Sequence, residues 1–351
     1  SSSAAISTGR SSRPASPPAP PEPVALPRLT GFTFGAFVVD ACPLGAGAAF
    51  ALGDGTVRLV EGDAARAVEA HRGAVLAAQP MSDGEALVTA GDDGRVVRIG
   101  ADGETTTLAE VGRKWIDQVA VGPGGVVAFA SGRMVWVRHA DGTMREIPHP
   151  RAAAGLAFAP KGLRLAVARY DGVTLWWAGT AAPPVELEWK GMHTAVTWSP
   201  DGRFVVTIMQ ENALHGWRVA DGKHMRMTGY PAKVRSMSWS PKGRFLATAG
   251  ADAAVLWPFH FKDGPMGKAP TELGHYRALV HRVACHPTDE IVALGYADGA
   301  IDVARIADGA AVRLREPDGA PVSALRWGGG GMSLLFGTET GAAGLVDIAA
   351  D

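Results

Sequence analysis

Residues 192–204 read Met-His-Thr-Ala-Val-Thr-Trp-Ser-Pro-Asp-Gly-Arg-Phe, and residues 232–245 read Ala-Lys-Val-Arg-Ser-Met-Ser-Trp-Ser-Pro-Lys-Gly-Arg-Phe. The two stretches share the pattern Trp-Ser-Pro-x-Gly-Arg-Phe, and Pro241 follows Pro200 by 41 residues. Each stretch alternates apolar and polar positions and then enters a tight-turn sequence, as a strand of an antiparallel sheet requires. Self-similarity at this period predicts a repeat architecture built from short strands.

Prolines mark the same point of the repeat along most of the chain. They are Pro43, Pro80, Pro123, Pro160, Pro200, Pro241 and Pro287. Four glycines at 328–331 stand where the eighth turn is due, so the chain has eight first-strand-and-turn signals. Two further series of turns, such as Asp93-Gly94 and Ala101-Asp102-Gly103, give three turns and hence four strands in each unit. This pattern predicts an all-β fold, a single eight-bladed β-propeller of four-stranded antiparallel blades, with seven blades as the alternative.

One propeller domain is predicted over residues 24–351, behind a Ser/Pro-rich tail at 1–23. The tail carries too few apolar residues for a core, so we expect it to be disordered. The final unit holds only three strands, and we expect residues 24–34 to supply its fourth strand and so to close the ring. Trp198, Trp239 and Trp327 are expected to be core residues that face the neighbouring blade. The predicted units span approximately 35–70, 71–110, 111–148, 149–189, 190–229, 230–274, 275–316 and 317–351.

Composition restricts the partners and the location. The formal net charge is −1, without the basic excess of a nucleic-acid-binding protein. No uncharged apolar run reaches the length of a membrane span, so no membrane insertion is expected. Cys42 and Cys285 are isolated, which indicates a reducing compartment, and the N-terminus has no secretory apolar region. We therefore expect a cytoplasmic protein that is a monomer or a subunit of a hetero-complex.

The Ser-Pro-Asp-Gly turn at 199–202, the third strands that end in Trp, and the dipeptide Gly274-His275 resemble the WD-repeat family of β-propellers. The resemblance covers roughly residues 28–351, although no unit contains the Trp-Asp dipeptide itself. It implies a rigid platform for protein–protein assembly without catalysis. Ser-Pro-Asp-Gly turns also occur in six-bladed periplasmic propellers of the TolB type, which the eight turn signals and the missing signal peptide disfavour.

In the WD-repeat family a His, an Asp and a Trp tie each blade together by hydrogen bonds. The resemblance assigns the His and Asp roles to two pairs, His71 with Asp93 and His275 with Asp298. It assigns the Trp role to Trp177, Trp217 and Trp257. No unit holds the full set.

The partner-binding face is predicted from the tyrosines. All four lie at second turns or in loops between units, and both kinds of loop emerge on the same face of a propeller. Tyrosine is favoured at interfaces because it buries a large area with few rotors and keeps a polar tip. Cations and other aromatic side chains on the same loops join them. The predicted partner-binding residues are Trp115, Arg169, Tyr170, Met209, Gln210, Tyr230, Lys233, Tyr276, Arg277 and Tyr296.

The alternative function is a propeller enzyme or a ligand or metal sensor that uses the central channel. Asp40, Asp117, His281 and Arg326 fall on predicted innermost strands. His281 and Cys285 share a strand face while His286 points away, and two ligands are too few for a zinc site. The sequence has no phosphate-binding loop, nucleophile elbow or His-Glu-x-x-His helix, so we predict no catalytic, cofactor or metal site and no enzymatic activity.

Overall fold

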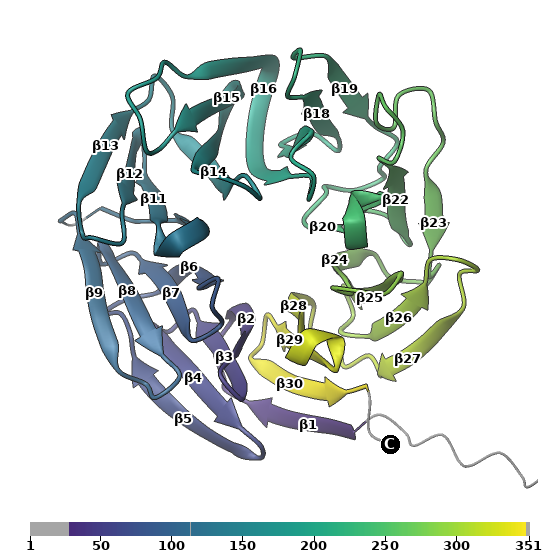
Figure 1. The fold of residues 1–351 in the computed structure, drawn as a ribbon. Coiled ribbons are helices and arrows are strands. Elements are labelled where there is room, and N and C mark those ends of the chain that lie inside the picture. The colour runs from purple at the N-terminus through teal and green to yellow at the C-terminus, as the bar shows by residue number, and fades with distance from the viewer. Residues whose placement is uncertain (1–27, 113, 349–351) are drawn as a thin grey trace, which may run out of the picture.

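The computed structural model describes residues 28–112 and 114–348. In this part of the chain the sheets are arranged radially in a closed ring (Figure 1), and the predicted all-β propeller fold is confirmed. The predicted tail at 1–23 lies outside the described residues. The units predicted from the sequence are called units 1 to 8 below.

Five of the units form separate four-stranded antiparallel sheets whose strands follow chain order from the ring centre outward. In units 1 to 3 the strands are β2 (Val38–Leu44), β3 (Gly47–Leu52), β4 (Thr56–Glu61) and β5 (Ala64–Glu69); β6 (Val75–Pro80), β7 (Ala86–Gly91), β8 (Arg95–Gly100) and β9 (Thr105–Glu110); and β10 (Gln118–Val121), β11 (Val127–Ser131), β12 (Met134–Arg138) and β13 (Met144–Pro148). In units 6 and 7 they are β20 (Met237–Trp239), β21 (Phe245–Thr248), β22 (Ala254–Pro258) and β23 (Thr271–Leu273); and β24 (Val280–Cys285), β25 (Ile291–Tyr296), β26 (Ile301–Arg305) and β27 (Ala311–Arg315).

Units 4 and 5 share one six-stranded sheet. Its strands are β14 (Ala153–Phe158), β15 (Arg164–Trp177), β16 (Val185–Trp198), β17 (Phe204–Met209), β18 (Leu214–Arg218) and β19 (His224–Met227). The two 14-residue strands change partners midway: β16 pairs with β15 as far as Met192 and with β17 from His193 onward. Strand β15 turns at Asp171, whose φ is 67°: its residues up to Arg169 pair with β14, and those from Tyr170 onward pair with β16.

Counted as hydrogen-bonded sheets, the described chain therefore has six sheets of four strands and one of six. The seven-bladed alternative matches this count. Units 4 and 5 do not form the two separate blades that we expected, because β16 runs without interruption from the outer edge of unit 4 into the centre of unit 5.

Unit 8 closes the ring with the start of the propeller chain. Its strands are β28 (Val322–Gly328), β29 (Ser333–Thr338), β30 (Ala342–Asp347) and β1 (Arg28–Thr33). Strand β1 pairs antiparallel with β30, which confirms closure by the N-terminal segment; residues 24–27 of the predicted strand lie outside the described residues. A Cβ on Gly337 would lie 2.3 Å from Cγ1 of Val38, so glycine permits unit 8 to pack on unit 1.

The core lies between neighbouring units, and the three predicted core tryptophans lie there. The indole N–H of Trp198 donates to the Ala157 carbonyl at 3.1 Å, and that of Trp327 donates to the Ala284 carbonyl at 2.9 Å. Trp239 is half-buried and donates to Thr197 Oγ1 at 3.1 Å. Each indole therefore reaches the preceding unit, as predicted. Three short 3-10 helices in the described residues form first turns: η1 (Pro123–Gly125), η2 (Pro241–Gly243) and η3 (Gly329–Gly331).

Candidate protein-interaction face

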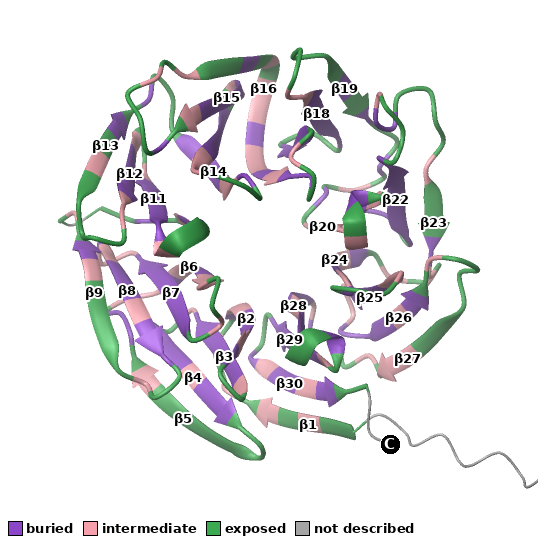
Figure 2. Ribbon diagram, in the orientation of Figure 1, coloured by how far each residue is buried: buried purple, intermediate pink, exposed green. Residues whose placement is uncertain are grey.

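Second turns and the loops between units emerge on one side of the ring, which we call the loop face. First and third turns emerge on the opposite face. Some side chains on this face form hydrogen bonds that hold the strands of a unit together. We call these side chains braces, and the remaining exposed residues are available to a partner. Figure 2 shows how the buried and exposed residues are distributed over the ring.

In unit 2 the expected pair is present. His71 Nδ1 lies 2.9 Å from Asp93 Oδ1, and His71 Nε2 lies 2.9 Å from Thr89 Oγ1. Asp93 also accepts the backbone N–H of Arg72 at 3.1 Å. Desolvation by burial lowers the pKa of His71 below its ordinary value. The assignment of His71 and Asp93 from the family resemblance is confirmed.

In unit 6 a tyrosine takes the place of the histidine. The Tyr230 hydroxyl lies 2.6 Å from Thr248 Oγ1 and accepts the indole N–H of Trp257 at 2.6 Å. Tyr230 is buried, and burial raises its pKa to about 12. The Trp role assigned to Trp257 is confirmed, but Tyr230 is not a surface residue because its hydroxyl joins two strands of its own unit.

In unit 7 the expected pair is wrong. His275 lies 3.3 Å from Glu272, whereas Asp298 accepts the Tyr276 hydroxyl at 3.1 Å. Tyr296 is fully buried and donates its hydroxyl to the Gly274 carbonyl at 2.7 Å, so it cannot contact a partner. Tyr276 is half-buried, and Arg277 beside it remains exposed.

Units 4 and 5 show which tryptophans serve as braces. His149 accepts the indole N–H of Trp176 on Nε2 at 2.9 Å. The Trp role assigned to Trp177 is therefore wrong by one position: Trp177 is 41% exposed on the opposite face. Trp217 is buried as expected, with its ring 5.5 Å from that of His193.

The loop face of units 4 to 6 brings three of the predicted partner-binding residues into one row. Tyr170 pairs with Met192 in the β15–β16 ladder, and the Met192 carbonyl accepts the backbone N–H of Gln210 at 2.8 Å. Gln210 Oε1 in turn accepts Lys233 Nζ at 3.2 Å. Tyr170 is 43% exposed, and Gln210 and Lys233 are also exposed. We call Tyr170, Met192, Gln210 and Lys233 the 4–6 row.

Two predicted residues beside this row are buried. Met209 lies in the core, so it cannot contact a partner. Arg169 donates to Thr174 Oγ1 at 2.9 Å and also binds Glu186. Its guanidinium therefore joins parts of its own unit and is not available to a partner. Next to the row, a depression of about 580 Å³ is lined by Arg169, Tyr170, Asp171, Glu188, Trp189 and Lys190.

Trp115 is the most exposed of the large apolar side chains in the described residues, at 69%. The next residue, Ile116, is buried and donates its backbone N–H to the Gly91 carbonyl at 3.1 Å. The loop is thus anchored where it presents the indole to solvent. Sequence reasoning missed Phe37 and Leu279, two exposed apolar residues that also precede innermost strands on this face. Their position directly before a predicted first strand could have indicated that they lie on the loop face.

The opposite face also exposes large apolar side chains, which its turn sequences did not lead us to expect. They are Trp177, Phe261, Met266 and Met332. Residue type alone therefore does not distinguish the two faces.

Four of the residues named for the alternative function bind one another or the backbone. Arg326 donates to Asp40 Oδ2 at 2.8 Å and to the Ala41 carbonyl at 3.0 Å. His286 lies 3.2 Å from the Gly331 carbonyl, and Cys285 donates to the Ser238 carbonyl at 3.4 Å. Asp117 is exposed and His281 half-buried. Residues from the inner strands of units 1 to 5 line a cavity of about 300 Å³.

Among the described residues, no group of three or more His, Cys, Asp or Glu is placed to hold a metal ion. Within the same residues, no helix has the length and apolar character needed to cross a membrane.

Comparison with solved structures supports the fold. The computationally designed Ika8 protein, in one of its crystal packings, aligns with a TM-score of 0.74 at 20% sequence identity, covering 90% of this chain and 98% of that chain. This similarity shows the fold alone. Residues 223–256 match the family model described as "WD domain, G-beta repeat". That match and the ring of sheets together support membership of the WD-repeat β-propeller family, whose members generally bind protein partners. No curated protein matches the chain.

Proposed function

We propose that the protein is a non-catalytic, cytoplasmic interaction scaffold whose protein partner docks on the loop face, over Trp115 and the 4–6 row. The observation that carries the proposal is the pairing of an anchored loop with a solvent-exposed indole at Trp115. Aromatic side chains that become buried at the centre of an interface contribute a large share of binding energy.

The 4–6 row adds an exposed tyrosine and polar groups on the same face. Gln210 and Lys233 offer hydrogen-bonding groups on the same surface as Tyr170, and their mutual contact at 3.2 Å limits the number of rotamers that binding must freeze. The depression beside Tyr170 has room for a side chain of the partner. Arg277, exposed on unit 7, lies on the same face and extends the surface.

Met209, Tyr230 and Tyr296 are excluded from the proposed surface because they are buried. Arg169 contributes by holding the β15 turn that presents Tyr170, to whose carbonyl it donates at 2.8 Å. Tyr276 contributes through its partly exposed ring.

The test is affinity capture followed by mass spectrometry, with matched variants. Trp115→Ala is expected to reduce recovery of a stoichiometric partner. Trp177→Ala is the control because it removes a second exposed tryptophan from the opposite face. Loss with Trp177→Ala and full recovery with Trp115→Ala would contradict the proposal. A retained small molecule or metal without a protein partner would favour the alternative function in the central channel.

A further inference from the structure

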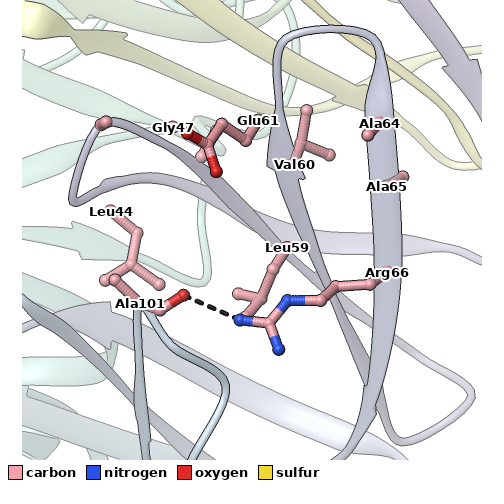
Figure 3. A pocket seen from close by; sticks show the side chains of 11 residues that line it. Leu44, Gly47, Leu59, Val60, Glu61, Ala64, Ala65, Arg66 and Ala101 are labelled. Atoms are coloured by element: carbon pink, nitrogen blue, oxygen red, sulfur yellow. Dashed lines mark hydrogen bonds between the residues drawn. The ribbon is translucent and has the colours of Figure 1, made fainter.

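Several arginines join neighbouring units by donating to a main-chain carbonyl of the next unit, and they differ in what balances their charge. In unit 1, Arg66 donates to the Ala101 carbonyl of unit 2 at 2.9 Å (Figure 3), and its side chain is exposed to solvent. In unit 8, Arg326 is half-buried, and besides the backbone of unit 1 it binds the Asp40 carboxylate at 2.8 Å. The first charge is thus balanced by water and the second by a counter-ion.

Arg282, on strand β24 of unit 7, makes the same kind of contact but has no counter-ion. Its Nε donates to the Ser323 carbonyl of unit 8 at 2.6 Å, and its Nη1 donates to the Arg235 carbonyl of unit 6 at 3.1 Å. Among the described residues, no carboxylate forms an ion pair with Arg282, and its Nη2 has no hydrogen-bond partner. The side chain is half-buried, and a buried charge is costly unless it is paired. Two neighbouring units therefore fix a guanidinium whose remaining edge is free.

The unit 8–unit 1 junction shows which group is missing at this edge. There the arginine binds the carbonyl of Ala41 and the side chain of the preceding residue, Asp40. Arg282 likewise binds the carbonyl of Ser323, but the preceding residue is Val322, an apolar side chain that is buried. Unit 8 therefore provides no carboxylate where unit 1 provides Asp40.

The other charges near Arg282 do not take the place of this carboxylate. Asp40 is already paired with Arg326, and Glu339, at the second turn of unit 8, is exposed. Burial lowers the pKa of Arg282 below its ordinary value, and the nearby charge of Arg235 acts in the same direction. Strand β24 begins on the loop face at Val280, so Arg282 lies near the loop-face end of the central channel. An anion that enters the channel from this face meets two guanidinium groups.

We propose that the free edge of Arg282, with Arg235 beside it, binds the carboxylate group of an acidic ligand at the loop-face end of the channel. The planar guanidinium matches a carboxylate in geometry, and such charge-assisted hydrogen bonds are among the strongest in proteins. The ligand is to Arg282 what Asp40 is to Arg326. A free small carboxylic acid and an acidic side chain of a docked protein present the same group, and the experiment below separates them.

The test uses the full chain alone, with sodium acetate as the probe and sodium chloride at the same ionic strength as the reference. A ligand that binds the folded state raises the midpoint of thermal unfolding. The wild-type midpoint is expected to rise with acetate until the site is saturated. Arg282→Gln should abolish this rise, and Arg235→Gln should reduce it. Arg72→Gln is the matched control, because it removes an exposed arginine of the loop face in unit 2 and should respond as the wild type does.

Asp40→Ala tests the comparison with Arg326, because it leaves that arginine without its carboxylate. Acetate should stabilise this variant more than the wild type. Equal responses to acetate in the wild type and Arg282→Gln would overturn the proposal. Arg235→Gln keeps the carbonyl that Arg282 binds, so an unchanged response in this variant would also overturn it, even if Arg282→Gln did not fold.

Competition then identifies the source of the carboxylate. If acetate weakens the binding of a captured protein partner to the wild type but not to Arg282→Gln, the carboxylate belongs to that partner. If partner binding is insensitive to acetate, the site takes a free acid. The acetate titration needs no partner, so its result stands even if no protein docks on the loop face.

Discussion

Tyr170 in unit 4 and Tyr230 in unit 6 lie on the same face of the ring, but only Tyr230 is buried. In unit 6, Trp257 donates its indole N–H to the Tyr230 hydroxyl. In unit 4, the corresponding indole of Trp176 is bound by His149 instead. Tyr230 precedes the first strand of its unit, the position that His149 takes in unit 4, whereas Tyr170 lies at a second turn. The position of a tyrosine within its unit therefore decides whether it braces the core or faces solvent.

The largest effect is expected from the third-strand tryptophans. Trp257→Ala should destabilise the fold by about 3–5 kcal/mol, because it opens a cavity and removes the partner of Tyr230. Trp177→Ala, in unit 4, should cost about 1 kcal/mol, because the side chain is 41% exposed and loses chiefly its contact with Arg164, 5.4 Å from its ring. Urea denaturation measures both. Equal losses would mean that Trp177 also braces its unit.

A smaller effect is expected from removing one hydroxyl. Tyr230→Phe leaves Trp257 Nε1 and Thr248 Oγ1 without this partner inside the core, which should cost about 1–3 kcal/mol. Tyr170→Phe is the matched control and should leave the unfolding free energy unchanged within about 0.5 kcal/mol. A neutral Tyr230→Phe variant would show that the hydroxyl does not brace unit 6.

The stabilising contributions of His149 and Tyr230 should be lost at opposite ends of the pH range. Burial lowers the pKa of His149 below its ordinary 6.5, so its stabilising contribution is present above about pH 6.5 and is lost as the pH falls. Burial raises the pKa of Tyr230 from 10 to about 12, so its contribution is present below about pH 10 and is lost as the pH rises toward 12.

Matched variants isolate each contribution, because His71, His193 and His215 also have lowered pKa values and add to the acid sensitivity. For His215, burial lowers the pKa to about 3. His149→Phe should weaken the pH dependence of the unfolding free energy between pH 5 and 7, and Tyr230→Phe should weaken it between pH 9 and 11. The reverse assignment would contradict the comparison.

The fold followed from the sequence because strand alternation and turn residues recur in each unit, as at Pro200 and Pro241. The merging of units 4 and 5 could not be predicted, since it depends on whether β16 breaks near Gly191. Two tryptophans are adjacent in unit 4, and the sequence does not show which of them binds the histidine. Neighbouring residues of a strand point to opposite faces. A shift of one position therefore reverses the assignment.

The partner surface was predicted only in part for a related reason. Tyrosine and histidine can both accept an indole N–H, and the sequence does not say which of them does so in a given unit. Tyr230 accepts the Trp257 indole N–H and Tyr296 donates to the Gly274 carbonyl, so both are internal, while Trp115 and Tyr170 are exposed. Met209 is buried as the last residue of β17, all of whose residues are buried, whereas Gln210 follows the strand and is exposed.

The most direct test of the account is the affinity of the captured partner for Tyr170→Ala and Tyr230→Phe, measured by calorimetry on folded protein. The account predicts that Tyr170→Ala raises the dissociation constant by about tenfold or more, as expected for an interface residue worth at least about 1.4 kcal/mol. Tyr230→Phe should leave the dissociation constant unchanged while lowering stability. An unchanged dissociation constant for Tyr170→Ala, together with weaker binding by Tyr230→Phe, would contradict the division of roles between the two tyrosines.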